Sequence, residues 1–300
     1  MRELAAGREV VVSRGELVQI GGGFRIPDIL RSSGATLREV GTTNVTTPAD
    51  YEAAVGDETA AILKVHHSNF RMRGFVETPS LRDLAGLRRD GRWLIMDLGS
   101  GNPLRNPPGT RGGEPTPREI LAGGADLVCF SCDKLLGGVQ GGAIAGRARL
   151  VERIARNPVM RAVRVDKLTY AALQVVLSHH LAGEHESVAL WRLAAPDRDS
   201  IAERARAIVG RAGLAPERAC VVDSEATFGG GSAPGGKIPS AAISLESAEP
   251  PDEVARWFQR REPPVLGTVR DGTFRIDPRT VLPEDEQPLV EALREWSRRG

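Results

Sequence analysis

The sequence lacks the features of a membrane or secreted protein. No apolar run approaches the roughly 20 residues that a membrane-spanning helix needs. The first residues, from Met1 to Leu4, lead directly into mixed polar sequence, without the apolar core of a secretion signal. Only 3 cysteines occur in 300 residues, and an odd number in a long chain does not make a disulfide framework. We therefore expect a cytoplasmic protein with no membrane partner.

The sequence also lacks an excess of charge of either sign and contains few aromatic residues. The chain has 40 basic and 39 acidic residues, a net charge of +1, so global charge favours neither a nucleic acid nor any other charged partner. Only 4% of the residues are aromatic, which gives no support for stacking on single-stranded bases. One local exception is the segment 147–167, with seven basic and two acidic residues. It fits contact with an RNA backbone and a solvated helix face equally well.

Short apolar runs alternate with helix-like segments through the first two thirds of the chain. Several runs, such as Leu94-Ile95-Met96, are continuously apolar, which is typical of strands covered on both faces. We expect strands at 10–13, 36–40, 60–65, 93–97, 126–131 and 142–145, with helices at 27–32, 49–55, 80–89 and 117–122. This alternation predicts an α/β fold with a mainly parallel sheet.

The remainder of the chain has a different pattern. Helical spacing of apolar residues marks 148–156, 168–181 and 198–212, after which strand-like runs at 219–222 and 241–245 precede a helix at 251–261. Asp271-Gly272 lies between two further runs and is a strong hairpin signal, and a helix at 284–298 closes the chain. We predict a large domain over 1–190 and a small α+β domain over 191–300.

Polar residues end or directly follow two of the predicted buried strands. The run that begins at Asp126 leads into Ser131, Lys134 and two glycines, and burial of a lysine lowers its pKa, which allows it to form a Schiff base. Ser131 could bind a phosphate. The strand 93–97 ends at Asp97, where α/β sheets place ligands. A carboxylate there fits the ring nitrogen of pyridoxal 5'-phosphate (PLP).

Each of these residues also has an ordinary structural interpretation. Lys134 fits a surface lysine in a turn after a strand, and Asp97 fits a turn or helix-capping aspartate. We expect no metal site. Cys129 and Cys132 form a C-x-x-C pair, but Cys220 is the only other cysteine, so a four-cysteine zinc site is impossible. The glycine-rich stretch before Lys237 lacks the Ser or Thr of a phosphate-binding P-loop.

The stretch from Ser131 to Gly142, SCDKLLGGVQGG, resembles the cofactor-lysine segment of the bacterial selenocysteine synthases, the L-seryl-tRNA(Sec) selenium transferases. Other stretches are similar to this family and follow in the same order along nearly the whole chain. They are SRGELVQIGG from Ser13, FRIPD from Phe24, EVGTTN from Glu39, HHSNF from His66, RAVRVDK from Arg161, GGGS from Gly229, PPVLG from Pro263 and DPRTV from Asp277.

The resemblance implies a fold-type I PLP-dependent transferase, with an aspartate-aminotransferase-like large domain that is incomplete at its N-terminus and a small C-terminal α+β domain. It implies conversion of seryl-tRNA(Sec) to selenocysteyl-tRNA(Sec), with selenophosphate as the selenium donor, via an aminoacrylyl intermediate. It also implies a homo-oligomer.

The resemblance assigns roles to particular residues. Lys134 would carry the cofactor and act as the base at Cα, Asp97 would hold the pyridinium nitrogen, and Ser131 would bind the phosphate. Arg161 and Arg164 would bind the anionic selenium donor, which suits the planar guanidinium group. His66 and Asn69, at the end of the strand 60–65, are further candidates for contacts near the cofactor ring.

The sequence departs from the family pattern at several positions. Cys132 stands where the family usually has Gly, Val139 where it has Pro, and Thr268 where it has Arg. The family's N-terminal segment, which is implicated in tRNA binding, has no counterpart in the sequence. Two other functions therefore stay open: a PLP-dependent lyase acting on small amino acids, and a non-catalytic relative that binds tRNA or protein.

Overall fold

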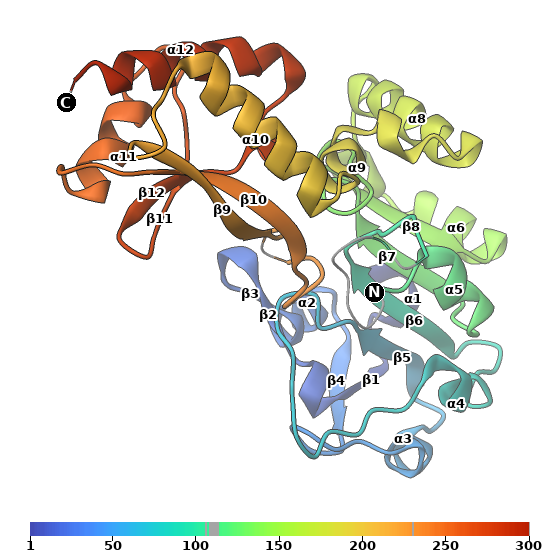
Figure 1. Ribbon diagram of the computed structural model, residues 1–300. Helices are drawn as coiled ribbons and strands as arrows, with labels where there is room; N and C mark the ends of the chain where they lie inside the picture. Colours follow the sequence, from blue (N-terminus) through green and yellow to red (C-terminus); the bar gives the residue numbers. More distant parts are fainter. Residues whose placement is uncertain (106, 108–113, 230, 300) are drawn as a thin grey trace. The chain divides into compact units, whose positions relative to one another are not determined.

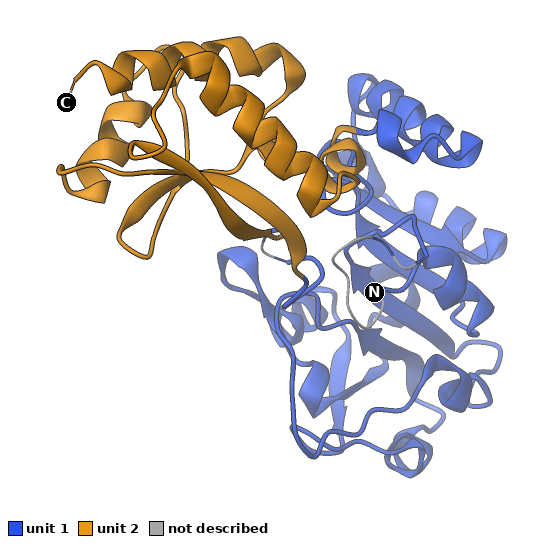
Figure 2. Cartoon of the chain, in the orientation of Figure 1, with its two compact units in different colours: residues 1–188, 228–236 blue, residues 189–227, 237–300 orange. Residues whose placement is uncertain are grey.

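The computed structural model describes residues 1–105, 107, 114–229 and 231–299 (Figure 1). The chain forms two compact units (Figure 2). Unit 1 comprises Met1–Val188 and the short segment Phe228–Gly236, whereas unit 2 comprises Ala189–Thr227 and Lys237–Gly300. The segment 228–236 therefore leaves unit 2 between two of its strands and packs with unit 1. No helix in the described ranges has the length and apolarity that crossing a bilayer requires.

A six-stranded mixed sheet forms the centre of unit 1, in the order β4-β1-β5-β6-β7-β8. The first five strands in this order are parallel, and β8 runs antiparallel to β7 at the edge. The strand bounds are β1 Glu9–Ser13, β4 Thr36–Val40, β5 Thr59–Val65, β6 Trp93–Gly99, β7 Leu127–Ser131 and β8 Gly142–Gly146. Every residue of β5 is buried, as expected for a central strand covered on both faces. The α/β class predicted from the sequence is confirmed.

Helices cover both faces of this sheet. Successive side chains of a strand point to opposite faces, so apolar residues of one strand pack against helices on both sides. Val10 and Val12 of β1 pack in one cluster with residues of α1, α2 and α6, while Val11 packs in another with residues of α3 and α4. The bounds are α1 Arg2–Ala5, α2 Ile26–Ser32, α3 Pro48–Ala54, α4 Leu81–Ala85, α5 Pro117–Ala122, α6 Ala148–Ala155, α7 Met160–Val163 and α8 Lys167–Ala182. The residue pairs Thr47/Asp50, Ser80/Asp83 and Thr116/Glu119 form capping boxes that begin α3, α4 and α5. Short β2 Gln19–Ile20 and β3 Phe24–Arg25 pair with each other.

Unit 2 contains an antiparallel four-stranded sheet in the order β11-β12-β10-β9. Asp271 and Gly272 both have positive φ, 49° and 75°, as the predicted two-residue hairpin turn between β11 and β12 requires. Phe258, Phe274 and Trp296 lie in the core of unit 2. The bounds are α9 Ala189–Ala194, α10 Arg198–Ala212, β9 Ala219–Ala226, β10 Ile238–Leu245, α11 Pro251–Gln259, β11 Thr268–Arg270, β12 Thr273–Ile276 and α12 Glu286–Ser297.

Candidate active site

The carboxyl ends of β5, β6 and β7 meet at one edge of the sheet in unit 1. In this register Val65 is the partner of Asp97, and Asp97 is the partner of Cys129. His66 follows β5 directly, and its backbone N–H donates a hydrogen bond of 2.8 Å to the carbonyl oxygen of Asp97. Ser131 is the last residue of β7, with Lys134 three residues further on. Parallel pairing thus brings His66, Asp97, Ser131 and Lys134 to the same edge.

Asp97 is the electrostatic centre of this edge. Burial raises the pKa of its carboxyl group, and the positive charges of Lys134 and His66 act in the opposite direction. Cys129 lies beside Asp97 in the sheet, and burial, with a smaller contribution from the Asp97 charge, raises the pKa of its thiol to about 12. Cys129 is therefore a neutral thiol at physiological pH, and Asp97 is the acidic group of this edge that interacts with Lys134.

Backbone hydrogen bonds hold the loop that carries Lys134. The N–H of Cys132 donates to the carbonyl of Gly141 at 2.8 Å, and the N–H of Gly138 donates back to the carbonyl of Cys132 at 2.8 Å. The N–H of Leu135 donates to the carbonyl of Ser100 at 2.9 Å, which ties the loop to the segment that follows β6. Lys134 is partly buried, whereas Asp133 beside it is exposed. The loop therefore directs the lysine, and not the preceding aspartate, into the interior.

Glu114 belongs to the same edge, although no sequence pattern marks it. Its Oε2 lies 3.1 Å from Nε2 of His66, and Glu114 is only 5% exposed. The two residues are 48 positions apart, and Glu114 precedes α5 in a segment without regular structure. No local pattern distinguishes such a residue from a surface glutamate.

Gly231 is the second residue that sequence reasoning missed. A Cβ atom added at Gly231 would lie 3.3 Å from Nζ of Lys134 and 3.6 Å from its Cε. Gly231, at the start of the stretch that has the appearance of an incomplete P-loop, therefore lies against the lysine within unit 1. The close approach depends on the absence of a side chain at this position.

Three predicted site residues lie further out. The side chain of Asn69 is exposed, and its Nδ2 donates to the carbonyl of Gln19 at 3.0 Å. Arg161 in α7 and Arg164 directly after it are exposed, and no contact between either side chain and Lys134 is found among the described residues. The next residue, Val165, lies beside the lysine loop, because a Cβ added at Gly141 would be 3.6 Å from its Cγ1.

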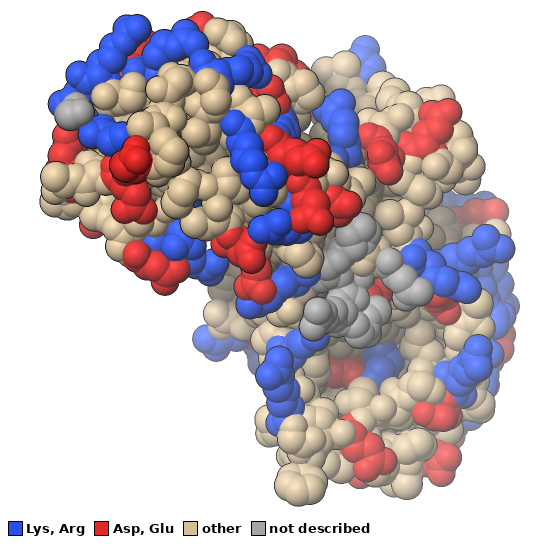
Figure 3. Space-filling view, viewed as in Figure 1, with Lys and Arg blue, Asp and Glu red and all other residues tan. Residues whose placement is uncertain are grey.

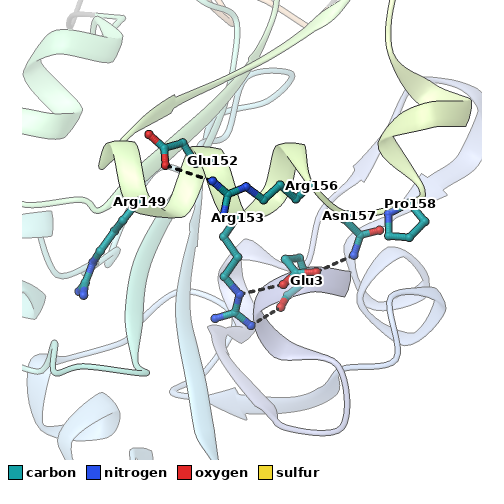
Figure 4. Close-up of a pocket in the computed structure, with 7 residues that line it drawn as sticks. All are labelled: Glu3, Arg149, Glu152, Arg153, Arg156, Asn157 and Pro158. Carbon is teal, nitrogen blue, oxygen red and sulfur yellow. Dashed lines mark hydrogen bonds and ion pairs between the residues drawn. The ribbon is translucent and has the colours of Figure 1, made fainter.

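A cavity of about 420 Å³ lies elsewhere in unit 1, along α6 (Figure 4). Its polar side chains bind each other: Nε of Arg153 donates to Glu3 at 2.8 Å, and Nδ2 of Asn157 donates to the same carboxylate at 2.6 Å. The cavity is lined by α6, which begins directly after β8. The last residue of β8, Gly146, pairs with Leu127 at the start of β7, so α6 begins near the amino ends of the parallel strands, away from Lys134. Among the described residues, no group of three or more side chains has the arrangement of a metal site.

The fold matches that of a solved D-glucosaminate-6-phosphate ammonia-lyase, with a TM-score of 0.61, 21% sequence identity, and coverage of 97% of this chain and 71% of that one. An α/β fold with this mixed sheet is that of the fold-type I PLP-dependent enzymes.

The family model for L-seryl-tRNA selenium transferase matches residues 1–282, and the chain belongs to this family. It is 42% identical over 299 residues to the L-seryl-tRNA(Sec) selenium transferase of Nitratidesulfovibrio vulgaris, covering 97% of this chain and 64% of the relative. It is 40% identical over 299 residues to that of Aquifex aeolicus, covering 98% and 66%. The chain thus spans about two thirds of the length of these relatives.

Membership of this family implies PLP as the cofactor. The residues at the carboxyl edge fit it. The partly buried carboxylate of Asp97 suits a protonated ring nitrogen, because an additional positive charge offsets the burial that raises the pKa of Asp97. Lys134 supplies an amine within electrostatic range of Asp97, and Ser131 supplies a hydroxyl at the end of the neighbouring strand.

We predict that Gly231→Ala slows attachment of PLP to Lys134 by about tenfold or more, because the new methyl group crowds Nζ. The measurement is the rate at which the visible absorbance of lysine-bound PLP develops in the purified protein.

Gly229→Ala is the matched control. Gly229 has φ +84° and Gly231 has φ +79°, so both substitutions strain the backbone, but a Cβ at Gly229 has no atom within 4 Å. Equal rates for the two variants would show that backbone strain, and not contact with Lys134, is responsible.

Proposed function

We propose that this chain carries the catalytic part of an enzyme that converts seryl-tRNA(Sec) to selenocysteyl-tRNA(Sec), with selenophosphate as the selenium donor. Membership of the L-seryl-tRNA selenium transferase family over residues 1–282 supports the reaction. The observation that carries it is that Asp97 and Lys134 lie at the same carboxyl edge of the sheet, where α/β folds bind ligands, and that their charges interact. An enzyme acting on aminoacylated tRNA would work in the cytoplasm.

When bound, PLP supplies an aldehyde that condenses with amines and a ring that withdraws electrons from the Cα of an attached amino acid. In our proposal Lys134 holds the cofactor covalently before the substrate binds. Asp97 then keeps the ring nitrogen protonated, and Ser131 donates a hydrogen bond to the phosphate. His66 contacts the cofactor near the ring, and Asn69 stabilises the segment that carries His66 through its bond to Gln19.

Lys134 also moves the protons in the proposed reaction. With the substrate amine joined to the cofactor, the freed amine of Lys134 would take the proton from the seryl Cα. The resulting ammonium group would return a proton to the hydroxyl on Cβ, which would leave as water. The selenium of selenophosphate would then bond to Cβ while Lys134 passes a proton from the donor back to Cα, and water would break the phosphorus–selenium bond and release phosphate. Lys134 is partly buried at the edge that carries Asp97, which suits a group that moves protons within the site.

Arg161 and Arg164 are the proposed binding residues for selenophosphate. Their exposed guanidinium groups lie next to the segment that packs on the lysine loop. Planar guanidinium groups bind tetrahedral oxyanions through paired hydrogen bonds. They belong to the basic segment 147–167, which we propose contacts the tRNA backbone. Figure 3 shows both basic and acidic side chains on the face that it draws.

We predict that borohydride reduction of the PLP-loaded protein leaves the cofactor attached to Lys134, located by peptide mass mapping. Lys134→Ala removes the visible absorbance and lowers selenium transfer by about 1000-fold or more, because both the attachment point and the base are lost. The control is Lys237→Ala, which changes an exposed lysine that pairs with Glu225 outside the basic segment. A reduced adduct on another lysine would refute the assignment.

We predict that the double change Arg161→Ala and Arg164→Ala leaves PLP binding intact and lowers selenium transfer by about 100-fold, because two anion-binding groups are removed. Steady-state rates at varied selenophosphate concentration give the measurement. The double change Arg156→Ala and Lys167→Ala removes the same charge from the same basic segment and serves as the control. Loss of PLP together with transfer would instead indicate a structural role for the arginine pair.

We also propose that the protein is a homo-oligomer in which a second copy covers α8. Large apolar side chains of this helix are exposed: Leu168 by 75%, Tyr170 by 61%, Val175 by 57% and Leu181 by 89%. An exposed apolar surface of this extent is uncommon on monomers. We predict that sedimentation velocity finds an oligomer, and that Leu168→Glu with Leu181→Glu dissociates it. A wild-type monomer at all concentrations would contradict the proposal.

A further inference from the structure

Glu114 is a buried acidic residue that the proposed reaction leaves without a role. It is 5% exposed, and its Oε1 has no hydrogen-bond partner among the described residues. Its Oε2 has one side-chain partner, Nε2 of His66 at 3.1 Å. An ionised carboxylate in such surroundings is costly unless a neighbouring positive charge compensates it. His66 is the residue in a position to supply that charge.

The fold holds Glu114 in this place from the backbone. The side chain of Asn102 is fully buried, and its Nδ2 donates to the carbonyl of Glu114 at 2.6 Å and to that of Leu104 at 2.6 Å. The N–H of Leu104 returns a bond of 3.0 Å to Oδ1 of Asn102. Asn102 follows β6 closely, so these bonds fix the Glu114 segment to the strand that carries Asp97. The position of Glu114 is therefore linked to the site and is not an accident of an exposed loop.

His66 connects Glu114 to Asp97. Its backbone N–H donates to the carbonyl of Asp97 at 2.8 Å, and its positive charge stabilises the Asp97 carboxylate. The titratable groups that face this ring in the described structure are Glu114 from the segment before α5 and Asp97 from β6, with Lys134 beyond Asp97. Negative and positive groups thus alternate in the order Glu114, His66, Asp97, Lys134.

We propose that Glu114 is a positioning residue of this site: its carboxylate fixes the ring of His66 through Nε2, beside Asp97. A carboxylate bound to one ring nitrogen sets the orientation of an imidazole. This inference rests on the proposed function, because it takes the edge with Asp97 and Lys134 as the cofactor site.

The first experiment compares wild type with Glu114→Gln, which keeps the size of the side chain and a hydrogen-bond acceptor but removes the charge. Proton NMR titration gives the pKa of His66, whose signals are assigned with the His66→Gln variant among the 5 histidines. We expect Glu114→Gln to lower the pKa of His66 by about one unit. We expect it to raise the Kd for PLP by about fivefold to tenfold, because a neutral acceptor holds the ring of His66 less strongly than a carboxylate does.

Glu119→Gln is the matched control. It removes a carboxylate from the same part of the chain, one that accepts a hydrogen bond from Thr116 and pairs with Arg105. It should change neither the pKa of His66 nor the Kd for PLP. A buried carboxylate with a purely structural role would affect folding but would leave the pKa of His66 unchanged in the folded protein.

A double-mutant cycle decides whether Glu114 acts through His66. In the His66→Gln background, Glu114→Gln should weaken PLP binding by less than about twofold, because the intermediary is absent. An equal loss in both backgrounds, or an unchanged pKa of His66, overturns the inference while leaving the proposed function standing. Failure of the wild-type protein to bind PLP at all overturns the proposed function and, with it, the role of Glu114 at a cofactor site.

Discussion

The parallel register of β5, β6 and β7 is the constraint on which the candidate site depends. Because Val65, Asp97 and Cys129 are partners across these strands, the strands end together and their following residues share one edge. A slip of one residue would turn every side chain of a strand to the opposite face and bury Asp97 among the helices. The buried pair of Lys64 in β5 with Glu16 opposes such a slip, since a shifted strand would separate the two charges.

Charge compensation then explains why polar groups persist at this edge. Burial alone raises the pKa of Asp97 and would favour its neutral form, whereas Lys134 and His66 favour the carboxylate. Glu114 repeats the pattern on the other side of His66. A PLP ring with a protonated nitrogen fits into such an arrangement because it adds positive charge next to Asp97. Acidic and basic groups in this site therefore depend on each other, and removal of one changes the charge state of its neighbours.

Much of the fold could be predicted because its signals are local. The apolar runs that predicted strands at 36–40, 93–97 and 142–145 overlap β4, β6 and β8 closely, and Asp271-Gly272 forms the predicted turn. The predicted ends of helices and strands differ from the observed ones where tertiary contacts decide them. The helix predicted at 80–89 ends at Ala85, where the backbone turns back through bonds from Leu87 to Leu84 and from Arg88 to Ala85. The strand predicted at 219–222 extends to Ala226, because β10 pairs with β9 along the whole length of both strands.

The sequence by itself determined which polar residues lie at or just beyond the ends of the buried strands. Asp97, Ser131 and Lys134 could therefore be proposed from short segments of chain. Strand formation and burial depend on local apolar pattern, which a sequence displays directly. Only the tertiary structure decided that Glu114 contacts His66, 48 positions away, and that Gly231 approaches Lys134. Both contacts join segments without regular structure, and their formation depends on how the whole of unit 1 packs, which no local pattern encodes.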